Sequence, residues 1–278
     1  MEYAAFISNI ENIDRIKNDG FPSDLIPDSW KENTLSFNRL YFGQEFCEKL
    51  IPSTNDIGKA LDFAQNNNME FTFLTPFVTE DGLEKWEKIL EYMHGMKPGA
   101  EVVINDMGIF HLIRERFPDF KRVLGRLLTK QKRGPRILRM KGKVPDETIE
   151  HFQRFNADAP KLAGFYKNLG FTRIELDNTL QGISRDNETP ASLYFPYIYV
   201  STTRMCLTNQ CDDRKESMRA IFPCKKECRQ IHFTIEHGEI PIPVTIAGNT
   251  QFIYNDRLPE SPDNLHIDRL VYEPCVPV

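Results

Sequence analysis

Short apolar runs alternate with segments of helical periodicity along the first two thirds of the chain. The run 70–78 is apolar over most of its length, which is typical of a buried strand. The segment after it carries Leu83, Trp86, Leu90 and Met93 at helical spacing, so it predicts a helix with one apolar face. The expected strands are 3–8, 40–46, 70–78, 101–105, 122–128 and 173–176, and the expected helices are 10–18, 57–65, one that starts at 79–81, one that starts at 106–108, 146–155 and 159–168.

The repeated order of strand and helix predicts how the strands are arranged. Successive steps of this kind place parallel strands side by side with the helices outside. The 278 residues have room for about seven or eight such steps. We therefore expect an α/β fold, namely a (β/α) TIM-like barrel, complete or imperfect, with a doubly wound open sheet as the alternative. Neither an internal repeat nor a low-complexity linker divides the sequence, so residues 1–278 are expected to form a single barrel-like domain.

The last third of the chain has a different pattern. One strand is expected over 193–201, and it leads directly into a cysteine-bearing segment, 204–229. The runs 230–236 and 240–247 are separated by His237-Gly238-Glu239, which is a hairpin signal. The last expected strands are 251–254 and 267–272.

Five of the six cysteines are placed to hold a metal centre. Cys206, Cys211, Cys224 and Cys228 form the pattern C-x4-C-x12-C-x3-C, and Cys47 lies far upstream at the end of an apolar run. Thiolates are soft ligands, and a group of four selects zinc or an iron–sulfur cluster. The spacing alone does not choose between these two.

The cellular compartment follows from the ends and the hydropathy of the chain. Residues 1–6 lack the basic start and long apolar core of a signal peptide, and no apolar stretch approaches membrane-spanning length. We therefore expect a cytoplasmic protein without membrane insertion. In a reducing compartment, clustered cysteines are more often metal ligands than disulfides, so a disulfide-stapled secreted domain is the disfavoured alternative.

Charge is unevenly distributed along the chain, whose formal net charge is −5. The block 121–143 contains ten basic residues and no acidic one: Lys121, Arg122, Arg126, Lys130, Lys132, Arg133, Arg136, Arg139, Lys141 and Lys143. Such a block could bind RNA phosphates, a carboxylate-rich small molecule or an acidic partner. The alternative is a solvated loop beside an acidic surface of the same protein.

Barrel enzymes gather their catalytic groups at the carboxyl ends of the strands. Cys47 and Cys206 each follow an expected strand, so distant cysteines can meet at one rim. The polar residues at or near expected strand ends are Glu45, Asn105, Asp106, Arg126, Arg204 and Asn249. Among them, Arg126 and Arg204 are candidates to clamp a carboxylate or phosphate of a small-molecule substrate. Asp106 is a candidate proton relay, or it caps the helix that begins at Met107.

Peptidase chemistry has little support from the residues themselves. The sequence contains neither a Gly-x-Ser-x-Gly elbow nor a His-Glu-x-x-His helix. The six histidines show no metal-ligand spacing.

Several segments resemble the collagenase-like peptidase (U32) family, in particular its divergent branch of UbiU and UbiV proteins. Residues 40–48 resemble a segment in which a run with Tyr, Gly and Glu precedes a cysteine, and 204–208 resemble an Arg-Cys-Phe-Thr element. Cys224-x3-Cys228 matches the paired cysteines of that branch. The segments 103–108, 244–254 and 267–272 are similar to family strands, so the likeness runs in order from about residue 40 to 272.

The resemblance implies a cofactor and a reaction. In that branch four cysteines hold a [4Fe–4S] cluster, and the matching positions are Cys47, Cys206, Cys224 and Cys228, with Cys211 as a fifth candidate. The branch serves oxygen-independent hydroxylation of a quinone precursor in ubiquinone biosynthesis, so the chain is expected to be the enzyme or a subunit with a paralogous partner. Other branches hydroxylate RNA bases, which is the first alternative. A zinc-stabilised barrel or a peptidase-like protein is the second.

Overall fold

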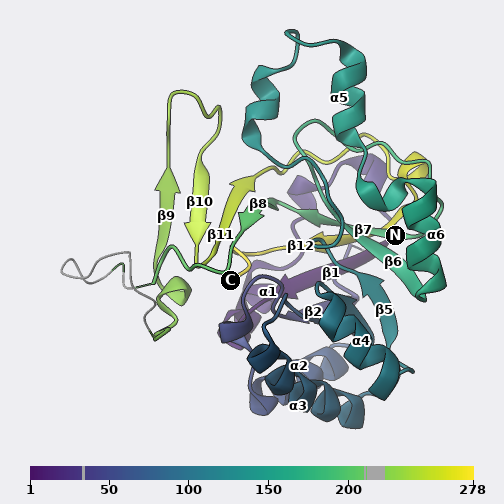
Figure 1. The fold of residues 1–278 in the computed structure, drawn as a ribbon, viewed down its shortest axis with the longest axis vertical. Coiled ribbons are helices and arrows are strands. Elements are labelled where there is room, and N and C mark those ends of the chain that lie inside the picture. Colours follow the sequence, from purple (N-terminus) through teal and green to yellow (C-terminus); the bar gives the residue numbers. More distant parts are fainter. Residues whose placement is uncertain (33–34, 210, 212–222) are drawn as a thin grey trace.

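Eight parallel strands form a closed barrel in the computed structural model, which describes residues 1–32, 35–209, 211 and 223–278 (Figure 1). The strands are β1 (Glu2–Ile7), β2 (Arg39–Gly43), β3 (Glu70–Leu74), β4 (Glu101–Ile104), β5 (Lys121–Leu124), β6 (Phe171–Asp177), β7 (Ala191–Phe195) and β12 (Ile267–Tyr272). Their order around the barrel is β1-β12-β7-β6-β5-β4-β3-β2. Parallel pairing of β12 with β1 closes the ring, which confirms the predicted TIM-like barrel and excludes the open sheet.

Helices follow the first five strands. They are α1 (Ile13–Asp19), α2 (Thr54–Asn66), α3 (Glu80–Met96), α4 (Met107–Arg116), α5 (Asp146–Gln153) and α6 (Pro160–Asn168). The 3-10 turns are η1 (Ile10–Asn12), η2 (Ser23–Leu25), η3 (Asp28–Trp30), η4 (Glu48–Leu50), η5 (Pro135–Arg139), η6 (Asn156–Asp158), η7 (Glu227–Arg229) and η8 (Asp263–Leu265). Ser53 and Asp56 form a capping box at the start of α2. In the described ranges, no helix is long and apolar enough to cross a membrane.

The strands are buried on both faces, which explains their continuous apolar runs. Outward side chains such as Phe73 and Val102 pack against the helices, including Trp86 and Leu90 of α3. Inward side chains fill the barrel with one cluster: Ala4, Phe6, Tyr41, Leu74, Val103, Val123, Tyr194 and Val271. The barrel interior is therefore a packed core, so a ligand or active site is expected at the strand ends and in the connections.

A four-stranded antiparallel sheet is inserted between β7 and β12 and lies beside one end of the barrel (Figure 1). It comprises β8 (Tyr197–Thr202), β9 (His232–Ile235), β10 (Val244–Ala247) and β11 (Thr250–Tyr254) in the order β8-β11-β10-β9. Pairing of β9 with β10 confirms the predicted hairpin. The sheet faces the carboxyl ends of the strands, because Phe46, which follows β2, packs against Tyr199 and Phe252.

The prediction of one strand over 193–201 is wrong. Two strands occupy this stretch: β7 belongs to the barrel, and β8 belongs to the inserted sheet. Pro196 separates them. Proline has no amide hydrogen to donate to a strand neighbour, so the barrel ladder ends here and the chain turns into the second sheet.

Candidate metal and active site

Cysteines from three distant segments meet at the carboxyl end of the barrel. Cys47 follows β2, Cys206 follows β8, and Cys228 lies within η7, four residues after Cys224. Cys47 and Cys228 pack against one apolar cluster between the barrel and the inserted sheet, formed by Phe46, Leu50, Tyr199, Ala247, Phe252 and Val278. The apolar cluster therefore holds the β2 connection and the η7 segment together.

The charges of these four thiols act on one another. Burial, together with the charges of the three other cysteines, raises the pKa of the Cys228 thiol to about 12. Burial, with the charges of Cys224 and Cys206, raises the pKa of Cys47 to about 11. A bound metal cation would offset this mutual repulsion and favour the thiolate forms. Four soft sulfur donors that repel one another fit a thiolate-bound metal centre.

The thiols are grouped loosely. Across the described ranges, no three Cys, His, Asp or Glu side chains lie as close together as a metal ion would hold them. Cys228 is buried, Cys47 and Cys206 are half-buried, and Cys224 is exposed. The group therefore lies at the edge of the protein, with Cys224 on its solvent side.

Cys211 and Cys275 are the remaining two cysteines. The Cys211 amide donates to the carbonyl oxygen of Thr208 at 3.3 Å, and residues 212–222, which follow it, lie outside the described part of the chain. Burial raises the pKa of Cys275, and the charged groups that act on it are Arg15 and Glu273. The choice of Cys47, Cys206, Cys224 and Cys228 over Cys211 remains a prediction.

Next to Phe46 and Tyr199 of the apolar cluster, Arg126 is fully buried in a cage of carboxylates. Its Nη1 donates to Asp177 at 3.0 Å and its Nη2 to Glu273 at 2.9 Å. Glu45 accepts from Nε at 3.4 Å and also from Nη2. Asp177 in turn accepts from Nε of Arg133 at 2.5 Å. The guanidinium of Arg126 is thus committed to protein carboxylates, and it is not open to an anionic ligand in this arrangement.

The cage holds more acidic than basic groups, since three carboxyls meet two guanidinium groups. Burial raises the pKa of Glu45, and it raises the pKa of Glu273 to about 8 in spite of Arg126. Burial disfavours the charge of Arg126, but the surrounding carboxylates outweigh this and raise its pKa above the ordinary value. Burial in the cage therefore favours the protonated forms of Glu45 and Glu273.

The other predicted catalytic residues lie around the same rim. Arg204 is exposed, with its guanidinium 5.3 Å from the centre of the Phe77 ring and Nη2 donating to Val78 O at 3.3 Å. Asp106 is the N-cap of α4 and accepts from the amides of Gly108 at 2.7 Å and Ile109 at 3.1 Å. Of the two roles considered for Asp106, the capping role is present.

Asn105 and Asn249 tie connections together. Asn105 donates to Thr75 O at 2.9 Å and accepts from Leu127 N at 3.0 Å, so it joins the ends of β3, β4 and β5. Asn249 lies in the β10–β11 turn and donates to Phe46 O at 2.6 Å. Sequence reasoning missed Asp177 and Glu273, the partners of Arg126. A signal was available, because each is an acidic residue at the end of an apolar strand.

The basic block is divided between the interior and the surface. Arg126 and Arg133 are buried, and Arg122 donates to Leu169 O and Pro118 O. Exposed side chains are those of Lys121, Lys130, Lys132, Arg136, Arg139, Lys141 and Lys143. Arg139 reaches Gly238 O in the β9–β10 connection. Most of the exposed positive charge of the block 121–143 therefore lies on the long connection between β5 and α5.

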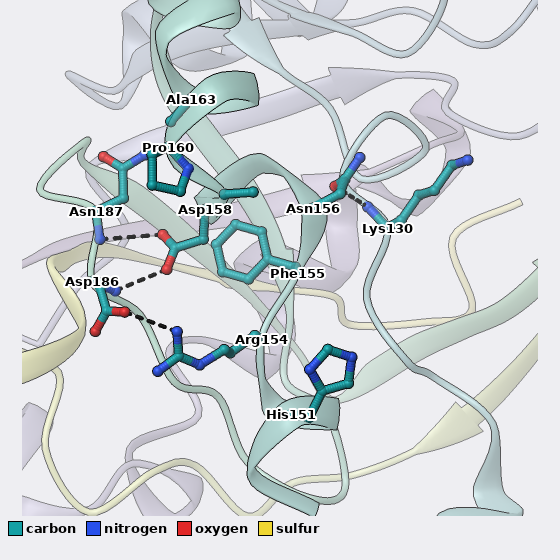
Figure 2. A pocket seen from close by; sticks show the side chains of 11 residues that line it. Lys130, His151, Arg154, Phe155, Asn156, Asp158, Pro160, Ala163, Asp186 and Asn187 are labelled. Atoms are coloured by element: carbon teal, nitrogen blue, oxygen red, sulfur yellow. Dashed lines mark hydrogen bonds and ion pairs between the residues drawn. The ribbon is translucent and has the colours of Figure 1, made fainter. Parts of the chain in front are cut away.

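A cavity of about 800 Å³ lies between α5, α6 and the β6–β7 connection, and Lys130 of the basic block is one of its lining residues (Figure 2). Arg154 pairs with Asp186 at 3.0 Å, and Asp158 accepts from the amides of Asp186 and Asn187. The residues that line the cavity are Lys130, His151, Arg154, Phe155, Asn156, Asp158, Ala159, Pro160, Ala163, Asp186 and Asn187. None of the predicted cysteine or catalytic residues contributes to its wall.

The chain was compared with protein-family profiles, curated proteins and solved structures. No protein-family profile matches the chain, and no curated protein does. Among solved structures, the chain is similar to one described as "The Structure of the U32 Peptidase Mk0906". The two sequences are 11% identical, the match covers 98% of this chain and 92% of the other, and the TM-score is 0.45.

Proposed function

We propose that this chain is an iron–sulfur protein in which Cys47, Cys206, Cys224 and Cys228 bind a [4Fe–4S] cluster. We further propose that it serves oxygen-independent hydroxylation of a quinone-like small molecule, as the enzyme or as one subunit beside a paralogous partner. The cluster would supply one-electron transfer at the barrel rim.

The observation that carries the proposal is that Cys47 and Cys228 pack on one apolar cluster and that the charges of Cys47, Cys206, Cys224 and Cys228 act on one another. A structural zinc site is usually built from ligands close together in sequence, whereas here Cys47 is 159 residues from Cys206. The mutual charge repulsion of the thiols also supports a bound cation. Four thiolates favour iron–sulfur or zinc over magnesium or calcium, because those two hard cations prefer oxygen ligands.

The chain's own residues have separate roles in this proposal. Arg204 is exposed two residues before Cys206, so its guanidinium can bind a carboxylate or phosphate group of a substrate close to the cluster. Arg126 has an indirect role, because its hydrogen bond fixes the side chain of Glu45, which is two residues before Cys47. Asp106 holds the start of α4.

Purification without oxygen tests the cofactor. Wild-type protein is expected to be brown, to absorb broadly near ~400 nm and to contain about four irons per chain, as ligation by four thiolates requires. Cys228→Ala is expected to remove the cluster, while Cys275→Ala, the matched control, keeps it. A colourless protein with one tightly bound zinc would overturn the iron–sulfur assignment. Complementation of anaerobic quinone hydroxylation then tests the reaction, with Arg204→Ala expected to keep iron and lose activity.

RNA modification is a second candidate, and the exposed positive charge between β5 and α5 favours it. Lys132, Arg136, Lys141 and Lys143 are exposed, so phosphates in solution can reach them. Binding of a structured RNA should then weaken steeply as salt rises, and the slope should fall in the Lys141→Ala/Lys143→Ala double variant. Binding that is absent at low salt would remove this candidate.

A further inference from the structure

The turn between β10 and β11 touches every segment that carries the four cysteines. Asn249 is almost fully buried in this turn. Its side-chain nitrogen donates to Phe46 O at 2.6 Å and to Thr203 O at 2.7 Å. Phe46 immediately precedes Cys47, and Thr203 lies three residues before Cys206. One amide group therefore uses both of its hydrogens to hold two cysteine segments that are otherwise remote in sequence.

The orientation of this amide is fixed by its oxygen. Thr250 Oγ1 donates to Asn249 Oδ1 at 3.2 Å. Thr250 Oγ1 also lies 2.9 Å from Thr202 Oγ1 on the neighbouring strand β8. The side chain therefore has all of its hydrogen-bonding groups satisfied, so it is a rigid link.

The backbone of the same turn adds contacts to the Cys206 segment and the Cys228 segment. Gly248 O accepts from Leu207 N at 2.9 Å, and Leu207 follows Cys206 directly. Gly248 has φ +62°, a conformation that suits glycine. A Cβ at this position would lie 3.3 Å from Cys228 Cβ and 3.6 Å from Cys228 Sγ. The absence of a side chain therefore lets Cys228 pack directly on the turn.

We infer that Gly248 and Asn249 are positioning residues of the metal centre: they set the spacing of the Cys47, Cys206 and Cys228 thiols. This inference rests on the proposed metal site, but it does not depend on whether the metal is iron or zinc. Residues that hydrogen-bond to metal ligands without binding the metal fix the ligand geometry, and their loss typically weakens metal binding about 10–100-fold. The turn would act on the metal through the three segments that it binds.

The test compares Asn249→Ala with Asn255→Ala. Asn255 lies at the other end of β11 and also bridges segments, since it donates to Asn178 O at 2.8 Å, so it is a matched control outside the cysteine group. Each variant is loaded with metal, and the rate at which it loses the metal to a chelator is measured. The unfolding midpoint of each variant without metal is measured separately. Asn249→Ala is expected to lose metal about 10–100-fold faster than wild type. Asn255→Ala is expected to lose it at the wild-type rate.

Gly248→Ala provides a second, independent variant if Asn249→Ala does not fold. Its added methyl group presses on Cys228 and equally on Val278, so faster metal loss is expected while the Leu207–Gly248 hydrogen bond is kept. Wild-type rates in both variants would overturn the inference. The inference would also be overturned if Asn249→Ala and Asn255→Ala lost metal at equal rates and showed equal falls in the unfolding midpoint without metal. That pattern would indicate general destabilisation of the fold. Tight zinc in place of iron would overturn the iron–sulfur proposal alone, and wild-type protein that binds neither metal would overturn both.

Discussion

Nη2 of Arg126 lies 2.9 Å from Oε1 of Glu273, a residue 147 positions later in the chain. The pair joins the ends of β5 and β12, which are not neighbours in the barrel. Both side chains are completely shielded from solvent. The ion pair therefore links two non-adjacent strand ends of the barrel, and Arg126 also lies against Phe46 and Tyr199 of the apolar cluster on which Cys47 and Cys228 pack.

Replacing Arg126 with alanine is expected to destabilise the fold. The substitution leaves Glu45, Asp177 and Glu273 without their shared cation, and an uncompensated buried charge costs about 3–5 kcal/mol. Urea unfolding measures the change. Arg136→Ala is the matched control from the same basic block, because its side chain is exposed, and a shift within about 0.5 kcal/mol is expected. Equal effects of the two substitutions would show that the buried cage is not a source of stability.

Glu175, in the barrel interior, should make stability depend on pH. Burial raises its pKa to about 7, so folded protein keeps a proton that the unfolded chain releases near its ordinary pKa. The free energy of unfolding should therefore fall as pH rises between about 4.5 and 7, by up to about 1.4 kcal/mol per pH unit.

Glu175→Gln removes this dependence. Tyr41 and Ser192 donate to Oε1 of Glu175 at 3.1 Å, and a glutamine oxygen can accept the same bonds. The difference in unfolding free energy between wild type and Glu175→Gln should shift in favour of the variant as pH rises through this window. The exposed Glu188→Gln is the control and should show a constant difference. Parallel pH profiles for wild type and Glu175→Gln would mean that Glu175 is already ionised at low pH.

Asp106 should be replaceable by asparagine. Asparagine is as good an N-cap as aspartate, so Asp106→Asn should keep stability and activity, while Asp106→Ala should lose about 1 kcal/mol. Ser53→Ala, which removes the N-cap of α2, should cost a similar amount without affecting catalysis. Unfolding and activity are measured on the same preparations. Loss of activity in a stable Asp106→Asn protein would instead assign Asp106 a proton-transfer role.

The cysteines should differ in how much metal they retain. Cys47→Ala should lower the iron content as much as Cys206→Ala, because their charges act within one thiol group. Cys211→Ala should have a mild effect. Iron analysis of the three anaerobic proteins measures the ranking. The reverse ranking would mean that the segment 204–229 supplies every ligand and that Cys47 is a buried thiol at a strand end.

The barrel could be predicted from the sequence because its strands are buried on both faces. Runs such as 70–78 and 101–105 are apolar throughout much of their length, and helical spacing follows each. The split at Pro196 was missed, since the residues on both sides of it are equally apolar and aromatic. Periodicity reports burial, but it does not report which sheet buries a strand.

The candidate site could be predicted only in part. The cysteines were recognisable because few other roles demand clustered thiols, whereas Asp177 and Glu273 are single acidic residues whose partner is set by tertiary structure. Arg126 was expected to face a ligand. Its commitment to protein carboxylates arises from three separate strand ends, which no local pattern can bring together.

The closing strand β12 gives this protein a defined order of assembly. β1 precedes the other barrel strands in the chain, yet one of its two edges pairs with β12, through partners such as Glu2 and Arg269. During synthesis that edge stays unpaired until β12 has left the ribosome, after the whole inserted sheet and its cysteines. Contacts between such remote segments slow folding, and an open strand edge invites pairing with another chain. A nascent chain that stalls before residue 267 is therefore the form of this protein most exposed to aggregation.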